Sequence, residues 1–216
     1  ESWHPEGDAW KHTLQVVDAA AEIMRREKMS EEEVLVFMLA ALSHDLGKPT
    51  KTEKKVKNGV EVITSDGHDM EGGWMSEEFI NAFAPTANVE ILRDENGDYV
   101  GLDETDFAKE FRARVRILTE KHMQLKMLYL IYKEDFKKNP EKAERNARKS
   151  LGRVARKLSE KDTNIFALSF LTEADQRGRN GDSDTPLERS EVEDLENWQS
   201  WLNEMMKEVK IEKKLP

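Results

Sequence analysis

The sequence predicts an all-α domain that carries one or two small inserted β-hairpins. Apolar residues recur at helical spacing through most of the chain, and cap signals precede several of these segments. Strand-like segments do not alternate regularly with helices, which argues against a parallel sheet. With 216 residues, the chain is long enough for one large domain with an appendage.

Two helices are predicted first, separated by a short connection. In "HTLQVVDAAAEIM", one stripe at helical spacing is formed by Leu14, Val17, Ala21 and Met24. The segment "SEEEVLVFMLAALSHDL" starts with Ser30 and Glu33, the spacing of a capping box in which each side chain satisfies the other residue's free amide. Gly47 and Pro49 follow the His-Asp pair and predict that this helix ends there.

Three more helices are predicted in the second half. "NPEKAERNARKSLGRVARKL" has Asn139 as its cap and Pro140 at its first position. Its buried stripe is expected to be Leu151, Val154, Ala155 and Leu158. The apolar segment "NIFALSFLTEADQRG" ends at Gly178, where we expect a left-handed residue. The last helix, "SEVEDLENWQSWLNEMMKEV", is expected to pack into the core through Trp198, Trp201, Leu202 and Met205.

Two segments have the pattern of a tight hairpin. "KVKNGVEVITSDG" and "VEILRDENGDYVGL" each place an Asn-Gly pair between short alternating stretches. The stretch "RGRNGDSDTPLE" predicts a loop. We therefore expect a main domain over residues 1–184 and a C-terminal helix, in residues 185–216, packed on it.

Composition limits the function classes. The chain has no cysteine, which excludes disulfides and thiolate ligands, and no apolar run long enough for a membrane span, so we expect a cytoplasmic protein without a membrane partner. It begins with Glu rather than Met, which leaves open whether the chain is a trimmed piece of something longer. The net charge of −10 argues against a surface that follows nucleic acid along its whole length. Residues 137–161 are the exception, with ten Lys and Arg against three Glu, and they form either a solvated face or a patch for an anionic substrate.

Histidines are the main candidates for chemistry. Besides His4, the chain has four that lie beside a turn signal or at the end of an apolar run: His12, His44, His68 and His122. A single such histidine is usually structural. His44 directly precedes Asp45, and imidazole with carboxylate suits a divalent metal such as Zn, Mn, Fe, Ni or Mg. Without cysteine, an open site that also binds water is expected, where a metal lowers the pKa of water and stabilises charge on a phosphoryl oxygen.

A further carboxylate stands near the end of a later helix. In "LTEADQRGR", Asp175 is followed by Arg177 and Arg179. Asp175 is either a metal ligand or an acid paired with these arginines, and the stretch alone does not decide. Guanidinium groups match phosphate oxygens in pairs, which favours a phosphate-bearing substrate.

Taken in order, these residues resemble the signature of the HD-domain metal-dependent phosphohydrolases. The likeness is greatest to the HD domain of bacterial tRNA nucleotidyltransferases, in the segments "HPEGDAWKHT", "LSHDLGK", "GHDMEGG", "EKHMQ" and "LTEADQRGRNG". The resemblance implies a helical HD bundle and one divalent ion, or two, with the first bound by His12, His44, Asp45 and Asp175. It also implies hydrolysis of phosphomonoesters or 2′,3′-cyclic phosphodiesters of nucleotides or RNA ends. The Gly-Ser and paired-Asp motif of the nucleotidyl-transferring head is absent from these residues, so CCA addition is not expected of them.

The resemblance also implies roles around the metal. Asp45, Lys48, His68 and His122 are the expected catalytic residues, with the two histidines as ligands of a second metal or contacts to the phosphate. Lys48, Arg177 and Arg179 are expected to bind the substrate, which is a phosphate-bearing small molecule, a nucleotide or an RNA end. Two alternatives remain: a hydrolase of another HD branch acting on dNTPs, guanosine alarmones or cyclic nucleotides, and a non-catalytic module that binds tRNA or a nucleotide.

Overall fold

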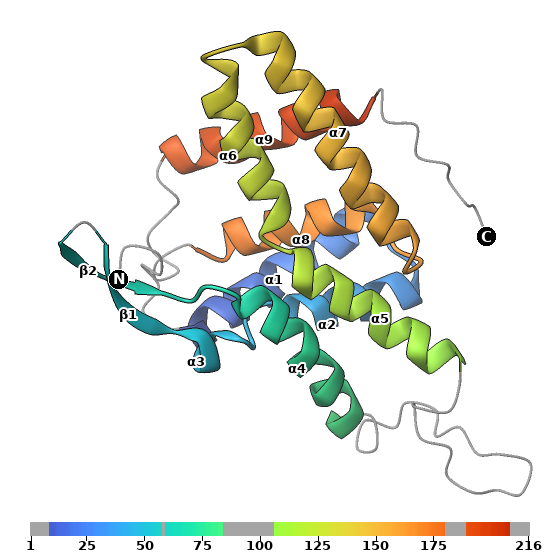
Figure 1. The fold of residues 1–216 in the computed structure, drawn as a ribbon. Helices are drawn as coiled ribbons and strands as arrows, with labels where there is room; N and C mark the ends of the chain where they lie inside the picture. The colour runs from blue at the N-terminus through green and yellow to red at the C-terminus, as the bar shows by residue number, and fades with distance from the viewer. Residues whose placement is uncertain (1–8, 58, 84–105, 180–188, 208–216) are drawn as a thin grey trace, which may run out of the picture.

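Helix α8 (Ile165–Arg177) is the central element of the fold, and the other long helices pack around it. The computed structural model describes residues 9–57, 59–83, 106–179 and 189–207. On one side of α8 lie α1 (Ala9–Glu27) and α2 (Glu31–Ser43), with α4 (His68–Phe83) and α5 (Asp106–Lys121) packed against α2 (Figure 1). The other end of α8 is covered by α6 (Gln124–Phe136) and α7 (Pro140–Ser159), and α9 (Arg189–Met206) packs on these two helices.

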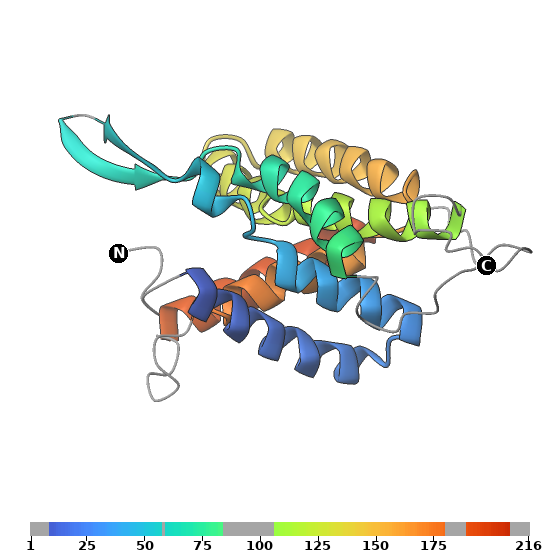
Figure 2. The same cartoon turned by 90° about the horizontal axis from the view of Figure 1, so that it is seen from below.

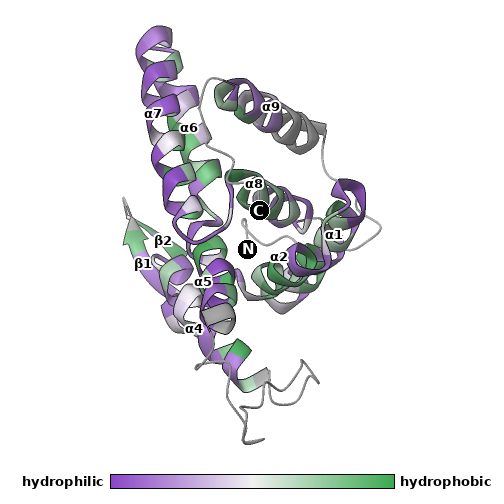
Figure 3. Cartoon of the chain, turned by 90° about the vertical axis from the view of Figure 1, so that its right-hand side faces the viewer, coloured by the Kyte–Doolittle hydropathy of each residue, from purple (hydrophilic) through white to green (hydrophobic). Residues whose placement is uncertain are grey.

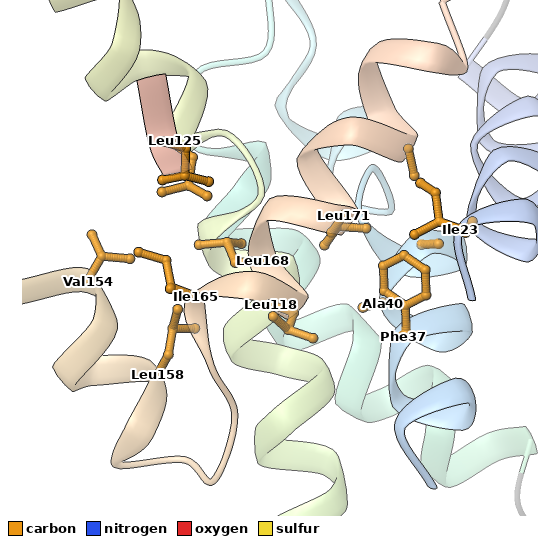
Figure 4. Close-up of a cluster of buried hydrophobic side chains, with 14 of the residues drawn as sticks. Ile23, Phe37, Ala40, Leu118, Leu125, Val154, Leu158, Ile165, Leu168 and Leu171 are labelled. Atoms are coloured by element: carbon orange, nitrogen blue, oxygen red, sulfur yellow. The ribbon is translucent and has the colours of Figure 1, made fainter. Parts of the chain in front are cut away.

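The core follows α8 from end to end. Its side chains Ile165, Leu168 and Leu171 are almost fully buried and face neighbours from several helices (Figure 4). The partners around them include Phe37, Leu118, Leu125, Val154 and Leu158. One continuous cluster therefore joins the helices, and the prediction of an all-α bundle is confirmed.

The predicted helix starts are confirmed where caps were expected. Ser30 and Glu33 form the capping box of α2, and Asn139 caps α7 with Pro140 in its first turn. The expected buried stripe of α7 and the aromatic face of α9 are both buried. On the last helix, Trp198, Trp201, Leu202 and Met205 join the common core.

Two local predictions were wrong. On α1 the buried face holds Val16, Ala20 and Ile23, whereas Leu14 is 45% exposed, so the stripe is rotated toward His12. Gly178 has φ −71°, so it is not left-handed. A Cβ at Gly178 would lie 2.3 Å from Val16 Cγ2, so a glycine is needed here because α8 ends against α1.

A single described hairpin projects away from the helices. Strands β1 (Glu53–Lys57) and β2 (Val60–Thr64) pair antiparallel, with Glu53 opposite Thr64, and follow the short helix α3 (Lys48–Lys51) (Figure 2). Gly59 in the turn has φ 78°, as a two-residue hairpin turn requires. The first predicted hairpin is confirmed. The second, around Asn96 and Gly97, lies outside the described residues, as does most of the predicted loop after Arg179.

The turn between α2 and α3 places the His-Asp pair. None of the helices in the described part combines the length and apolar character needed to cross a membrane. Helix α2 ends at Ser43, and His44, Asp45 and Gly47 form the turn before α3. Pro49 lies in the first turn of α3, so it starts that helix rather than ending α2 as expected. The His-Asp pair therefore sits in a tight turn between two helices.

Candidate metal centre

Six ionisable side chains from five separate segments meet in the interior. His12 is on the first turn of α1, His68 begins α4, His122 follows α5, and Asp175 is near the end of α8. His44 and Asp45 complete the set from the turn after α2. His12 and His44 have no exposed surface, and Asp175 is 2% exposed. Such burial of ionisable groups is unfavourable unless they are paired or bind an ion.

Each of the four histidine rings is fixed by a backbone carbonyl. The Nδ1 atom lies within 3.0 Å of the carbonyl oxygen of Gly178 for His12, Ala41 for His44, Ser65 for His68 and Thr119 for His122. A carbonyl can only accept a hydrogen bond, so every Nδ1 carries the proton. In the neutral ring, the lone pair is then on Nε2, the atom that points into the centre.

The Nε2 atoms converge with the two carboxylates in two groups. His12, His44 and Asp175 form one, and Asp45, His68 and His122 form the other; in each group the potential ligand atoms lie within 4.8 Å of one another. In the first, His12 Nε2 is 3.3 Å from His44 Nε2 and 3.1 Å from Asp175 Oδ1. Either group offers imidazole and carboxylate donors of the kind that divalent metals bind.

Asp45 lies between the two groups. Its Oδ2 is 3.2 Å from His44 Nε2 and 3.7 Å from His12 Nε2. Its Oδ1 is 3.4 Å from His68 Nε2 and 4.0 Å from His122 Nε2. One carboxylate therefore faces both sets of imidazoles.

These donors fit a metal better than they fit one another. His12 and His44 both present lone pairs at Nε2, and two lone pairs at 3.3 Å repel unless a proton or a cation lies between them. Asp45 Oδ2 and His68 Nε2 are buried, yet within the described part of the chain neither makes a hydrogen bond of good geometry. The close approach of Lys48 Nζ to Asp45 Oδ2, at 2.6 Å, is therefore an ion pair.

The pKa values of the two carboxylates fall although both are buried. Burial alone would raise the pKa of Asp45, but His44, His68 and Lys48 outweigh it and hold the pKa well below its usual range. For Asp175, burial is again outweighed, here mainly by Arg179 and His12, and the pKa also lies well below the usual range. Both groups therefore stay ionised at neutral pH.

The pKa is raised for two of the histidines and lowered for a third. Burial lowers the pKa of His44 and His68, but Asp45 more than offsets this and the net change is upward. Burial, with repulsion from His44, lowers the pKa of His122 to about 4. His122 is therefore neutral at pH 7 and keeps its Nε2 lone pair.

Close backbone contacts, which were not predicted, hold the turn after α2 against its neighbours. A Cβ on Gly47 would lie 2.1 Å from the carbonyl oxygen of His68 and 2.7 Å from the nitrogen of Gly72. At the hairpin base, the hydroxyls of Thr52 and Ser65 are 2.8 Å apart, and Ser65 provides the carbonyl that holds His68. In the sequence, the glycines of "LSHDLGK" and "GHDMEGG" were the features that indicated a close backbone approach.

Of the three cations expected to bind the substrate, two lie beside the metal cluster and one does not. Lys48 and Arg179 lie beside the cluster, with Arg179 Nη2 3.3 Å from Asp175 Oδ2. Arg177, the last residue of α8, instead pairs with Glu22 on α1, whereas Arg179 lies in the turn after the helix. The expectation that both arginines face one substrate does not agree with this placement.

A further polar pair next to Asp175 was not predicted. Lys126 Nζ is 2.9 Å from Gln176 Oε1, and Gln176 Nε2 is 3.5 Å from Asp175 Oδ2. Lys126 belongs to α6 and Gln176 to α8, so tertiary packing alone brings them together.

Comparison with known proteins identifies the family. A model of the HD domain matches residues 9–147, which include four histidines and one carboxylate of the cluster. No curated protein and no solved structure matches the chain. Asp175 lies beyond the matched residues, yet the structure brings it to within 3.1 Å of His12. With the match covering more than half of its length, the chain belongs to the HD domain family.

Proposed function

We propose that this protein is a divalent-metal-dependent phosphohydrolase that acts on phosphomonoesters or 2′,3′-cyclic phosphodiesters. The observation that carries the proposal is the convergence of four Nε2 lone pairs, each fixed by an Nδ1 hydrogen bond, on two buried carboxylates. The HD domain match supports metal-dependent hydrolysis as the class of reaction.

In this proposal His12, His44 and Asp175 would hold the first ion, with Asp45 as a further ligand. A second ion would be held by His68 and His122 on the other oxygen of Asp45. A bound divalent ion supplies a water of lowered pKa and stabilises charge on a phosphoryl oxygen. Mn, Ni, Mg, Fe and Zn all remain candidates, since imidazole and carboxylate ligands accept each of them.

The chain's own residues prepare the centre for this chemistry. The carbonyl hydrogen bonds keep the imidazoles in one tautomer and orientation, as outer contacts of metal-binding histidines commonly do. Asp45 stays ionised, so it orients donors and does not serve as a strong base at neutral pH. Lys48 and Arg179 offer positive charge on two sides of the cluster, where it would stabilise a phosphate as its charge develops.

The resemblance of several segments to the HD domain of tRNA nucleotidyltransferases supports nucleotides or RNA ends as the substrate class. Hydrolysis of dNTPs, guanosine alarmones or cyclic nucleotides is the alternative. A substrate panel that contains 2′,3′-cyclic nucleotides, nucleoside monophosphates and these alternatives separates the branches.

The double substitution His44→Ala and Asp45→Ala tests the proposal. We expect loss of metal-stimulated hydrolysis, because both ion sites lose a ligand, with helical content retained in circular dichroism. Elemental analysis of the purified protein should find a divalent metal in the wild type and less in the variant. A metal-free wild type that hydrolyses at the same rate with and without added metal would overturn the proposal.

A further inference from the structure

The exposed face of α7 carries a row of cations. Six basic side chains are exposed on this helix: Lys142, Arg145, Lys149, Arg153, Arg156 and Lys157. At about 100° and 1.5 Å per residue, they occupy an arc of about 120° over about 22 Å of helix. The buried residues, such as Ala147, Leu151 and Leu158, lie on the opposite side. We call these six side chains the basic row.

The basic row has no ion-pair partner among the described residues. Within the residues that the structure describes, none of the six makes an ion pair, whereas exposed lysines such as Lys54, Lys137 and Lys207 pair with nearby glutamates. From Arg145 to Ser159 the helix contains no acidic residue. Figure 3 shows α7 as a largely hydrophilic helix at the edge of the fold. Glu141, Glu144 and Glu160 stand near the ends of the row but pair with none of its six side chains in the described part of the chain. The cations between them repel one another, and an anion that bound along the row would relieve this repulsion.

The chemistry of the row favours a phosphodiester backbone over other anionic partners. No large apolar side chain is exposed among the six cations, so the anchors typical of protein interfaces are missing from this face of α7. The apolar side of the helix is buried in the core, so it is not available to insert into a membrane as an amphipathic surface helix does. Guanidinium groups bind phosphate oxygens in pairs, and three of the six residues are arginines.

Gly152 gives a second reason to expect a ligand here. It lies in the middle of α7 beside the basic row, and a Cβ at this position would meet no atom within 4 Å. Glycine weakens a helix interior, and the packing of the chain does not require it at this position. The missing side chain leaves room for a partner's backbone to approach the helix closely.

We propose that the basic row of α7 binds the phosphodiester backbone of a nucleic acid, at a surface separate from the metal centre. No residue of the metal cluster lies on α7. Such binding depends on charge rather than base identity, so it would be strongly weakened by salt and would show little sequence preference. It would hold a nucleic acid independently of whether the metal centre hydrolyses a phosphate.

The test uses the full chain with its metal and a fluorescein-labelled RNA of about 20 nucleotides. Fluorescence anisotropy measures affinity from about 50 to about 200 mM salt, the range in which phosphate contacts cost most. The row variant is Arg145→Gln, Lys149→Gln and Arg153→Gln. Each lost phosphate contact to a single strand lowers the salt slope by about 0.7, so we expect a reduction of about 2 and at least a tenfold loss of affinity at low salt. A gel after the titration verifies that the RNA is intact.

A matched control removes the same net charge elsewhere. Lys54→Gln, Lys137→Gln and Lys207→Gln neutralise three exposed lysines outside the row, and affinity should change less than threefold. Equal losses in both triple variants would overturn the proposal, as would wild-type RNA binding in the row variant. Binding to phosphatidylserine vesicles but not to RNA would also overturn it.

Hydrolysis of a small phosphomonoester provides the independent readout. The row variant should keep wild-type activity and melting temperature, because its three side chains are exposed and contribute nothing to the metal centre. If the protein proves to have no hydrolase activity, the RNA titrations still decide whether the row binds nucleic acid.

Discussion

The Nε2 atoms of His12 and His44 face each other at 3.3 Å, although each ring has already donated its Nδ1 hydrogen to a carbonyl. Both side chains are fully buried, so bulk water does not reach the two lone pairs. A proton, which the raised pKa of His44 favours, or a metal ion between them would turn this repulsion into attraction. We therefore predict that metal binding at this position stabilises the fold.

Removal of metal should destabilise the protein. An ion at about 100 times its dissociation constant contributes about 2.7 kcal/mol, which for a chain of this size is a rise in melting temperature of about 5–10 °C. We expect EDTA to lower the melting temperature by this amount and added Mn²⁺ or Zn²⁺ to restore it. The variant His12→Gln with His44→Gln should respond much less, and an identical response would contradict the linkage.

The position of Asp45 between the two groups predicts two ions per chain. His68→Gln with His122→Gln should leave one ion, because Asp45 and the three ligands of the first group are unchanged. The reciprocal variant, His12→Gln with His44→Gln, should leave the other ion or lose both through weaker binding. Elemental analysis of equilibrated protein gives the count. Retention of two ions after loss of His68 and His122 would rule out the second site.

The low pKa of His122 predicts acid destabilisation of the metal-free protein. Between its ordinary pKa of 6.5 and its folded pKa of about 4, the unfolded chain binds a proton that the folded chain does not. Stability therefore falls as pH drops through this range, by up to about 3 kcal/mol. His44 and His68, whose pKa values are raised, act in the opposite sense and stabilise at low pH.

Urea unfolding of the EDTA-treated protein from about pH 4.5 to 7.5 isolates this contribution. His122→Gln removes the titrating group at similar volume, so its stability should depend less steeply on pH than that of the wild type. Parallel curves for the two proteins would show that His122 does not titrate as its burial implies.

The sequence was a good guide to helices but a weaker one to their rotation. Helix α1 has apolar residues on several sides, and Leu14 and Val17 formed as regular a stripe as Val16 and Ile23. The stripe with Val16 is the buried one because His12 on the same face contacts Asp175 and Gly178, which lie more than 160 residues away in the sequence. Such a long-range contact leaves no trace in local periodicity.

The candidate site was predictable where side chains carry the chemistry. Motif order selected His12, His44, Asp45 and Asp175, and the structure brings all four together. Backbone contributions were not predictable, because a carbonyl such as that of Ser65 has no signature in its side chain. The metal-binding roles themselves stay predictions, as does the domain division at residue 184.

Gly178 should be as important to the centre as a ligand. Gly178→Ala places a Cβ 2.3 Å from Val16 Cγ2 and 2.8 Å from the Val16 backbone nitrogen, so α8 must move away from α1. We expect a loss of about 1–3 kcal/mol in unfolding free energy, as for overpacked cores. Metal affinity should fall about 10–100-fold, because the carbonyl that holds His12 moves too.

Gly152→Ala is the matched control for this substitution. Its Cβ would enter open space on a helix, so stability should rise by about 1 kcal/mol with metal affinity unchanged. Adding Val16→Ala to Gly178→Ala should restore only part of the loss, because the contact with the Val16 backbone remains. Wild-type metal affinity in Gly178→Ala would contradict the role assigned to its carbonyl.

The two arginines after Asp175 should differ in function although they are two residues apart. Arg179→Gln removes a cation from an ionised, buried carboxylate, and hydrogen bonds to charged groups contribute about 1.5–3 kcal/mol, so kcat/KM should fall about tenfold or more. Arg177→Gln removes an ion pair with the exposed Glu22 and a longer one, at 3.8 Å, with Glu173, whose two oxygens stay bound to Arg26. This loss should cost about 1 kcal/mol of stability and leave activity within about twofold. Steady-state hydrolysis by the two variants, each with its melting temperature, makes the comparison. Equal losses of activity would mean that both guanidinium groups reach the substrate and that Arg177 leaves Glu22 when it binds.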